Sequence, residues 1–151
     1  MKVDGQHYRT IWLEGPDPGT VRIINQQLLP HRFEIIDIPD LEAMCAAIQD
    51  MTLRGAGLIG AAAGYGMYLA AREAAGTDDP RAFLQEAAAR LIATRPTAAN
   101  LANAVRRQER ALAAAGGDGE ALIRSARATA HAIADEDAEY CRRIGVHGLA
   151  L

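Results

Sequence analysis

Residues 50–67 read DMTLRGAGLIGAAAGYGM, and this stretch decides the fold. Residues 50–53 lead to Arg54-Gly55-Ala56, and a long run of small and apolar residues follows. A run that is apolar on every side predicts a core helix, here ending near Ala75. The first amides of a helix have no partner within it, so its N-terminus carries partial positive charge. We therefore expect a helix start that attracts an anion directly after Arg54.

The glycines of this stretch permit a second interpretation. Gly57, Gly60 and Gly64 lie three and four residues apart, so they share one helix face and permit close packing. A glycine-rich helix face is more often a packing device than a binding site. Arg54 favours a phosphate, because a planar guanidinium binds two phosphate oxygens at once. Both interpretations stay open at this point.

A second stretch, residues 94–100, repeats the arrangement with Arg95 followed by Pro96 and Thr97. Proline is favoured at the first helical position and threonine is a capping residue, so this stretch predicts a helix that starts at Pro96. Two helix starts, each beside an arginine, suit one anion if the fold brings them together. Asn100 and Asn103 fall in the first turns of this helix, and we interpret both as surface amides.

The first 39 residues predict a small antiparallel β meander. Residues 8–13 alternate in the period of two that is typical of a half-buried strand, and residues 21–25 and 33–38 are rich in β-branched side chains. Residues 14–19 are dense in turn formers. Trp12 fits better as a packing residue than as the wall of a ligand cleft.

Residues 40–151 predict a bundle of about five helices, which makes the fold class α+β and mostly α. The helices are expected to begin near Asp40, after Arg54, near Pro80, after Pro96 and near Asp118. The side chains expected to face inward include Leu41, Met44, Cys45, Ile48, Leu84, Leu91, Leu101, Leu112, Leu122, Tyr140 and Ile144. The charged runs 106–110 and 135–137 are expected on solvated faces.

Composition excludes several classes of function. A net charge of −3 argues against general nucleic-acid binding, which requires a basic face. The chain has two cysteines, Cys45 and Cys141, and no signal-peptide pattern or long uncharged apolar run, so we expect a cytoplasmic protein without a membrane span. His131 and His147 are too far apart for a helical metal pair, and no metal site is predicted.

Several motifs together resemble the 5-methylthioribose-1-phosphate isomerases of methionine salvage. That family is related to the alpha, beta and delta subunits of eukaryotic translation initiation factor 2B. The residues that carry the resemblance follow the expected order along the whole chain, in the segments 9–12, 28–34, 51–67, 94–101 and 144–148.

The resemblance implies an aldose–ketose isomerase that acts on a 1-phosphorylated pentose without a metal or organic cofactor. It assigns substrate binding to Arg54, Gly55, Ala56 and Arg95. The family's catalytic cysteine and aspartate lie in a Rossmann-like carboxyl-terminal domain beyond residue 151, so no catalytic residue is expected in this chain. Cys141 precedes the segment 144–148, whereas the reactive cysteine follows it. The complete protein is expected to be a homodimer that joins this half to the carboxyl-terminal half.

Two departures from the family pattern leave alternatives open. The family usually continues Arg-Gly-Ala with Pro-Ala, whereas this chain has Gly57-Leu58. One alternative is therefore an isomerase of ribose 1,5-bisphosphate or 5-deoxyribose 1-phosphate. The absence of the family's catalytic half from this sequence motivates another, a non-catalytic helical binding module like the amino-terminal region of the initiation factor 2B subunits. The retained arginines, Arg54 and Arg95, favour sugar-phosphate binding over this second alternative.

Overall fold

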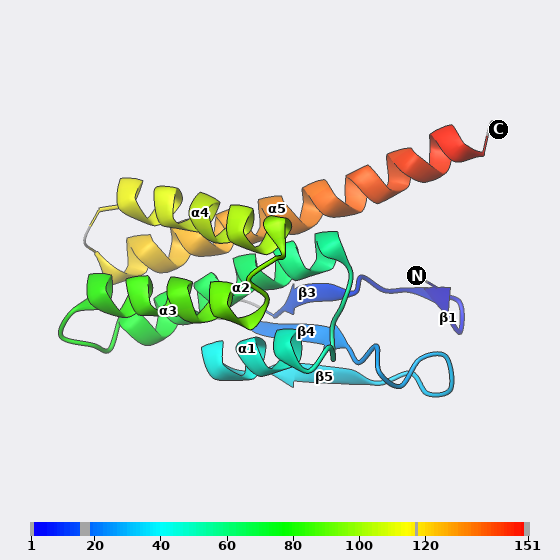
Figure 1. Ribbon diagram of the computed structural model, residues 1–151, viewed down its shortest axis with the longest axis horizontal. Coiled ribbons are helices and arrows are strands. Elements are labelled where there is room, and N and C mark those ends of the chain that lie inside the picture. The colour runs from blue at the N-terminus through cyan, green and yellow to red at the C-terminus, as the bar shows by residue number, and fades with distance from the viewer. Residues whose placement is uncertain (1, 16–18, 117, 150–151) are drawn as a thin grey trace.

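The computed structural model describes residues 2–15, 19–116 and 118–149. The strands are β1 (Lys2–Val3), β2 (Gln6–His7), β3 (Ile11–Glu14), β4 (Thr20–Ile24) and β5 (Ile35–Ile38). The helices are α1 (Leu41–Gln49), α2 (Ala56–Ala74), α3 (Pro80–Thr94), α4 (Ala99–Ala114) and α5 (Gly119–Gly148). Figure 1 shows a helical bundle with the strands gathered on one side of it. The predicted α+β, mostly helical fold class is confirmed.

The strands β3, β4 and β5 form the predicted antiparallel meander in that spatial order. Val21 and Ile23 of β4 are fully buried on the face toward the helices. Arg22 points to the other face, where it pairs with Glu14 at 2.6 Å and with Asp37 at 2.8 Å. The period of two therefore separates a core face from a polar face over Val21–Ile23, whereas Ile24, which alternation would place with Arg22, is also fully buried. The central residues of the predicted turn, 16–18, lie outside the described residues.

The hairpin of β1 and β2 was not predicted from the sequence. Its strands have two residues each, too short for a pattern, and the turn places Asp4 at φ +48° and Gly5 at φ +83°.

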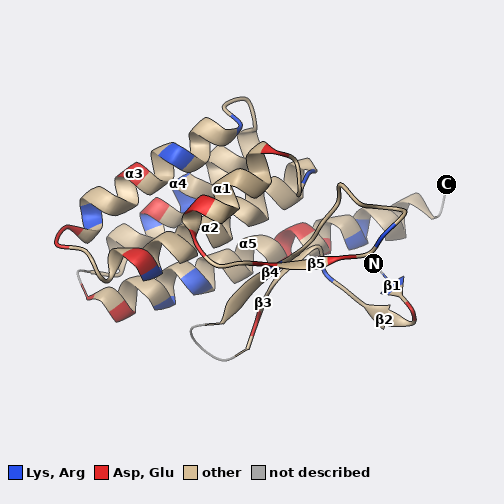
Figure 2. Ribbon diagram, turned by 90° about the horizontal axis from the view of Figure 1, so that it is seen from below, with Lys and Arg blue, Asp and Glu red and all other residues tan. Residues whose placement is uncertain are grey.

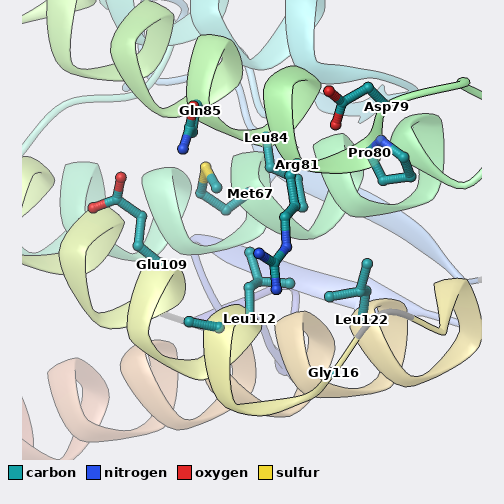
Figure 3. A pocket seen from close by; sticks show the side chains of 11 residues that line it. Met67, Asp79, Pro80, Arg81, Leu84, Gln85, Glu109, Leu112, Gly116 and Leu122 are labelled. Atoms are coloured by element: carbon teal, nitrogen blue, oxygen red, sulfur yellow. The ribbon is translucent and has the colours of Figure 1, made fainter.

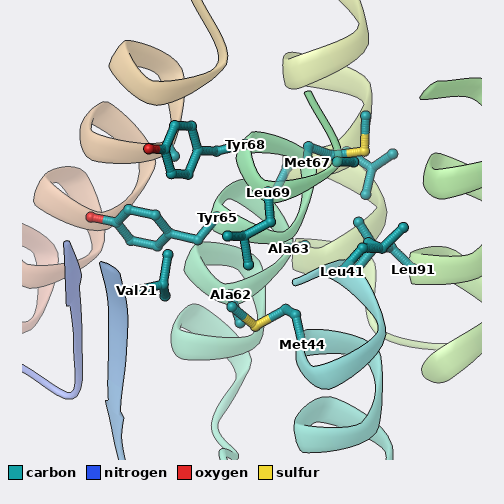
Figure 4. Close-up of a cluster of buried hydrophobic side chains, with 14 of the residues drawn as sticks. Val21, Leu41, Met44, Ala62, Ala63, Tyr65, Met67, Tyr68, Leu69 and Leu91 are labelled. Atoms are coloured by element: carbon teal, nitrogen blue, oxygen red, sulfur yellow. The ribbon is translucent and has the colours of Figure 1, made fainter. Parts of the chain in front are cut away.

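Helix α2 is the centre of the bundle. It contacts α1, α3, α4, α5 and strand β3, and its residues 58–71 are buried almost without interruption. Figure 4 shows Tyr65, Met67 and Leu69 of α2 in the core that Met44 of α1 and Leu91 of α3 complete. The predicted core helix is confirmed. Among the described residues, no helix is both long and apolar enough to cross a membrane.

Aspartates begin three of the helices, as predicted. Asp40 accepts a hydrogen bond from the amide of Ala43 at 2.7 Å, and Asp79 accepts one from Ala82 at 3.0 Å. Asp118 caps α5. These side chains satisfy amides that the first turn leaves unpaired.

The predicted start of α4 at Pro96 is wrong. The helix begins at Ala99, because Pro96 and Thr97 form a turn in which the amide of Ala98 donates to the carbonyl of Arg95 at 2.9 Å. A residue that precedes proline is pushed toward extended backbone, and Arg95 has φ −146° and ψ 78°.

The two charged runs are not simply solvated, in contrast to the prediction. Arg107 of α4 donates two hydrogen bonds to the carboxylate of Glu136 on α5, at 2.6 and 2.8 Å. Arg9 pairs with Asp135 at 2.6 Å. Figure 2 shows residues of both signs interspersed along the helices. The runs therefore join α5 to its neighbours through ion pairs.

The second half of α5 extends beyond the bundle (Figure 1). Tyr140 and Ile144, which were expected to face inward, are 59% and 71% exposed. Val146 and Leu149 are also exposed. The buried residues of α5 end at Ala134, and the last turns of the helix extend past the other helices of the bundle (Figure 1).

Gln108 is a buried polar residue that the sequence did not reveal. Its Nε2 donates to the carbonyl of Gly64 in α2 at 2.8 Å and to the carbonyl of Ala126 in α5 at 2.9 Å. One side chain of α4 therefore joins three helices in the centre of the bundle.

We predict that Gln108→Ala lowers the free energy of unfolding by about 2 kcal/mol or more, because it removes two buried hydrogen bonds and leaves a cavity. Urea denaturation measures the change. The matched control is Gln85→Ala on the exposed face of α3, which should stay within about 0.5 kcal/mol of the wild type. Equal effects of the two substitutions would contradict the structural role of Gln108.

Candidate functional site

The loop before α2 is held by the segment that follows β4. The amide of Gln26 donates to the carbonyl of Thr52 at 2.9 Å, and the amide of Arg54 donates to Oε1 of Gln26 at 3.0 Å. Nε2 of Gln27 donates to the carbonyl of Asp50 at 2.6 Å. The backbone of Arg54 is therefore fixed, while its side chain is exposed. The sequence did not indicate Gln26 and Gln27, because two glutamines after a strand resemble any solvated turn.

Gly55 makes the sharp entry into α2. Its φ of +114° favours glycine, and its carbonyl accepts the first helical hydrogen bond from Ile59 at 2.9 Å. No side chain caps this helix. The first amides of α2 are therefore not satisfied by a capping side chain.

The start of α4 is also open. Its N-cap residue is Ala98, which has no side chain able to accept a hydrogen bond. Arg95 lies three residues earlier and is half-exposed. Within the described part of the chain, the helices α1, α3 and α5 have aspartate caps, and the two helices preceded by Arg54 and Arg95 have none.

The two open starts lie close together. A Cβ placed on Gly60 would lie 3.2 Å from the backbone oxygen of Asn100, so the second turn of α2 is in contact with the first turn of α4. A cleft of about 340 Å³ opens there between α2, α4 and α5. The guanidinium groups of Arg54 and Arg95 do not line this cleft, and neither forms an ion pair with another described residue. The structure thus brings the beginnings of α2 and α4 together but places neither guanidinium group in the cleft between them.

The glycines of α2 also serve close packing, so the second interpretation of this stretch is supported as well. A Cβ at Gly57 would overlap the carboxylate of Asp137, and a Cβ at Gly64 would lie 3.2 Å from Cδ1 of Ile133. Both neighbours belong to α5. Because these glycines let α4 and α5 approach α2, packing and site geometry depend on the same residues.

The ion pair between Arg107 and Glu136 forms one wall of the cleft. The hydrogen bonds from Arg107 lower the pKa of Glu136, so this carboxylate stays charged well into the acidic range. The charge of Arg107 is balanced by Glu136 in this arrangement.

Two other hollows are present, one far from the helix starts and one that reaches the first turn of α2 at Leu58. Figure 3 shows a cavity of about 480 Å³ that Met67, Leu84, Leu112 and Leu122 line from α2, α3, α4 and α5. A cleft of about 550 Å³ lies between residues 7–11 and α5, and the exposed Cys141 lines it. In the described ranges, no three or more His, Cys, Asp or Glu side chains are grouped to hold a metal ion.

These features define a small α+β domain whose helices surround one glycine-rich central helix. The chain belongs to the initiation factor 2 subunit family, whose sequence model matches residues 52–151.

Curated relatives agree with this assignment. The methylthioribose-1-phosphate isomerase of Methylocella silvestris is 47% identical over 151 residues, which are 100% of this chain and 39% of that protein. The enzyme of the same name from Desulfatibacillum aliphaticivorans is 41% identical over all of this chain and 41% of its own length. The chain therefore spans about two fifths of the length of these relatives.

Solved structures support the same fold. The delta subunit of translation initiation factor eIF-2B from A. fulgidus superposes with a TM-score of 0.79 at 34% identity, covering 88% of this chain and 38% of that chain. The 5-methylthioribose 1-phosphate isomerase from Pyrococcus horikoshii superposes with a TM-score of 0.73 at 35% identity, covering 85% of this chain and 36% of that chain. The resemblance inferred from the motifs is confirmed.

We predict that Gly60→Val lowers the free energy of unfolding by about 1–3 kcal/mol, because the new side chain forces α2 and α4 apart. Gly145→Ala is the matched control, since a Cβ there meets nothing within 4 Å. It should raise the free energy of unfolding by about 0.5–1 kcal/mol, through the higher helix propensity of alanine. Urea denaturation of the 151-residue chain compares them, and a neutral Gly60→Val would contradict the close approach.

Proposed function

We propose that this chain is the amino-terminal, phosphate-binding part of an aldose–ketose isomerase. The reaction is the conversion of 5-methylthioribose 1-phosphate to 5-methylthioribulose 1-phosphate in methionine salvage. The observation that carries the proposal is the pair of adjacent, uncapped helix starts, each preceded by an unpaired arginine. The names of the relatives with 41% and 47% identity support the choice of substrate.

The proposed role of this chain is to hold and neutralise the phosphate. A sugar phosphate carries up to two negative charges at neutral pH, which suits amides that point out of two helix starts. Arg54 and Arg95 add charged hydrogen bonds, and Gly55 and Ala56 keep the approach to the backbone open. A sugar phosphorylated at carbon 1 does not open its ring freely, so a fixed phosphate orients the carbon atoms that react.

In this proposal, proton transfer is carried out by a carboxyl-terminal half. That half corresponds to the part of the relatives that this chain does not cover. Residues 1–39 and 40–151 together form one amino-terminal domain, and a cysteine and an aspartate of the other half act on the sugar. The exposed turns of α5 with Tyr140 and Ile144 suit a position between the two halves. The complete protein is proposed to be a cytoplasmic homodimer that needs neither nucleic acid nor a membrane nor a cofactor.

A second candidate is an isomerase of another 1-phosphorylated pentose, such as ribose 1,5-bisphosphate or 5-deoxyribose 1-phosphate. Gly57 favours it, because this residue replaces the proline usual in the resembled family at the start of α2. Leu58, the other departure, is 7% exposed and packs mainly into the core. Competition between sugars separates the candidates: a clear preference for another pentose removes 5-methylthioribose 1-phosphate as the substrate.

A third candidate is a non-catalytic binding module, which the TM-score of 0.79 with the initiation factor subunit favours. A chain that binds a protein partner and no sugar phosphate would support this candidate. The unpaired Arg54 and Arg95 favour the isomerase.

We predict that Arg54→Ala and Arg95→Ala each lower kcat/KM of the full-length natural protein by about tenfold or more, because each removes a charged hydrogen bond to the phosphate. Arg54→Lys should recover part of the loss, since lysine keeps the charge without the two-pronged geometry. Arg110→Ala, which removes an exposed arginine near the other end of α4, is the control and should leave kcat/KM unchanged. A loss of less than about threefold for Arg54→Ala, below 1 kcal/mol, would contradict the phosphate role.

A further inference from the structure

We propose that the 480 Å³ cavity between α2, α3, α4 and α5 binds a free α-amino acid with an apolar side chain. The inference goes beyond the proposed function, because this cavity shares no lining residue with the cleft between the starts of α2 and α4. The cavity lies at the opposite end of α4, close to the last residue of that helix, Ala114.

The wall of the cavity is mainly apolar. Leu84 of α3, Leu112 of α4 and Leu122 of α5 line it, and Met67 of the central helix α2 completes the wall (Figure 3). Sites for small molecules are mostly apolar hollows of roughly 300–1,000 Å³, and a volume of about 480 Å³ falls in the lower part of this range. The cavity therefore suits a small ligand with an apolar portion.

Charged side chains of opposite sign line the same cavity. Arg81 and Gln85 are exposed on α3, and Glu109 is exposed on α4. In Figure 3 the guanidinium group of Arg81 extends from α3 toward Leu112 of α4. The cavity thus combines an apolar wall with one cationic group and one anionic group.

These two charged groups have no partner within the described part of the chain. The side chains of Arg81 and Glu109 form no hydrogen bond or ion pair there, either with each other or with a third residue. Between α4 and α5, by contrast, Arg107 and Glu136 are joined by two hydrogen bonds. Opposite charges that line one cavity without pairing are both available to a ligand.

The two charges together favour a zwitterion over a simple ion. An apolar anion would be attracted by Arg81 but repelled by Glu109, and an apolar cation would meet the reverse. An α-carboxylate accepts two hydrogen bonds from a guanidinium group, and an α-ammonium group donates to a carboxylate. Both groups of an α-amino acid are attached to the carbon that carries the side chain. An apolar side chain then contacts the leucine-lined wall while the charged groups contact Arg81 and Glu109.

Calorimetry on the full-length natural protein tests the proposal, with L-leucine, L-methionine and L-phenylalanine as probes. We expect the tightest of the three to bind with a dissociation constant of about 1 mM or lower. Its analogues without the α-ammonium group or without the α-carboxylate should each bind at least about fivefold more weakly, because each loses a charged hydrogen bond. For leucine these analogues are 4-methylpentanoate and 3-methylbutylamine.

Charge-removing variants locate the charged contacts. Arg81→Met removes the positive charge and keeps an apolar stem, and Glu109→Gln removes the negative charge and keeps the shape. Each should weaken binding of the amino acid by about fivefold or more. Arg90→Met is the matched control, since Arg90 is exposed on the same helix as Arg81 and does not line the cavity. It should leave the dissociation constant unchanged.

A second pair of variants tests the cavity itself. Ala113 is exposed and lines the cavity, so Ala113→Phe should fill part of it and abolish binding. Ala114→Phe places the same ring on the neighbouring exposed residue, which does not line the cavity, and should leave binding unchanged. Because all these substitutions are at exposed positions, the variants should unfold within about 0.5 kcal/mol of the wild type.

Three results would overturn the proposal. The first is that none of the three amino acids binds at concentrations up to about 10 mM. The second is that the analogue without the ammonium group binds as tightly as the amino acid and Glu109→Gln has no effect, which would make the ligand an apolar anion. The third is unchanged binding in Ala113→Phe, which would place the amino acid elsewhere. The proposed function stands under all three results, because the cavity and the candidate phosphate site have no residue in common.

Discussion

The close approach of α4 and α5 to the glycines of α2 is the constraint on which the rest of the structure depends. At Gly60 the neighbour is the backbone of α4, and at Gly57 and Gly64 it is α5. A larger side chain at Gly60 would meet the backbone of α4, whereas at Gly57 and Gly64 it would chiefly displace side chains of α5. The same contacts bring the starts of α2 and α4 together. Packing of the bundle and geometry of the candidate site are therefore two consequences of one glycine-rich helix face.

The helix starts divide into two groups with different physical roles. An aspartate cap is worth about 1 kcal/mol, and three of the helices described above use one. The helices α2 and α4, which follow Arg54 and Arg95 in the chain, have no such cap and lack this stabilisation. Uncapped amides beside unpaired guanidinium groups are a poor arrangement for stability alone. The same arrangement suits a protein that binds an anion at these helix starts, and this is the basis of the proposed function.

Much of the fold could be predicted from local patterns, and the misses share a physical cause. The meander, the aspartate caps and the buried helix α2 follow from periodicity and capping, which act over a few residues. Arg107 and Glu136 lie far apart in the chain. The sequence of each helix alone therefore indicates a solvent-exposed charge and does not reveal their ion pair. The burial of Gln108 was not predicted either, because its hydrogen-bond partners belong to two other helices. The inward position expected for Tyr140 was wrong, because an apolar stripe does not reveal where its partner helices end. Arg54 was placed correctly before the start of α2, whereas Arg95 lies three residues before the N-cap of α4, because Pro96 and Thr97 form a turn that the capping pattern did not indicate.

The measurement that tests the central claim most directly is a crystal structure of the full-length natural protein with 5-methylthioribulose 1-phosphate bound. The account predicts that phosphate oxygens accept hydrogen bonds from the first amides of α2 and contact the guanidinium groups of Arg54 and Arg95. A phosphate bound elsewhere, with these amides and both arginines facing water, would contradict it.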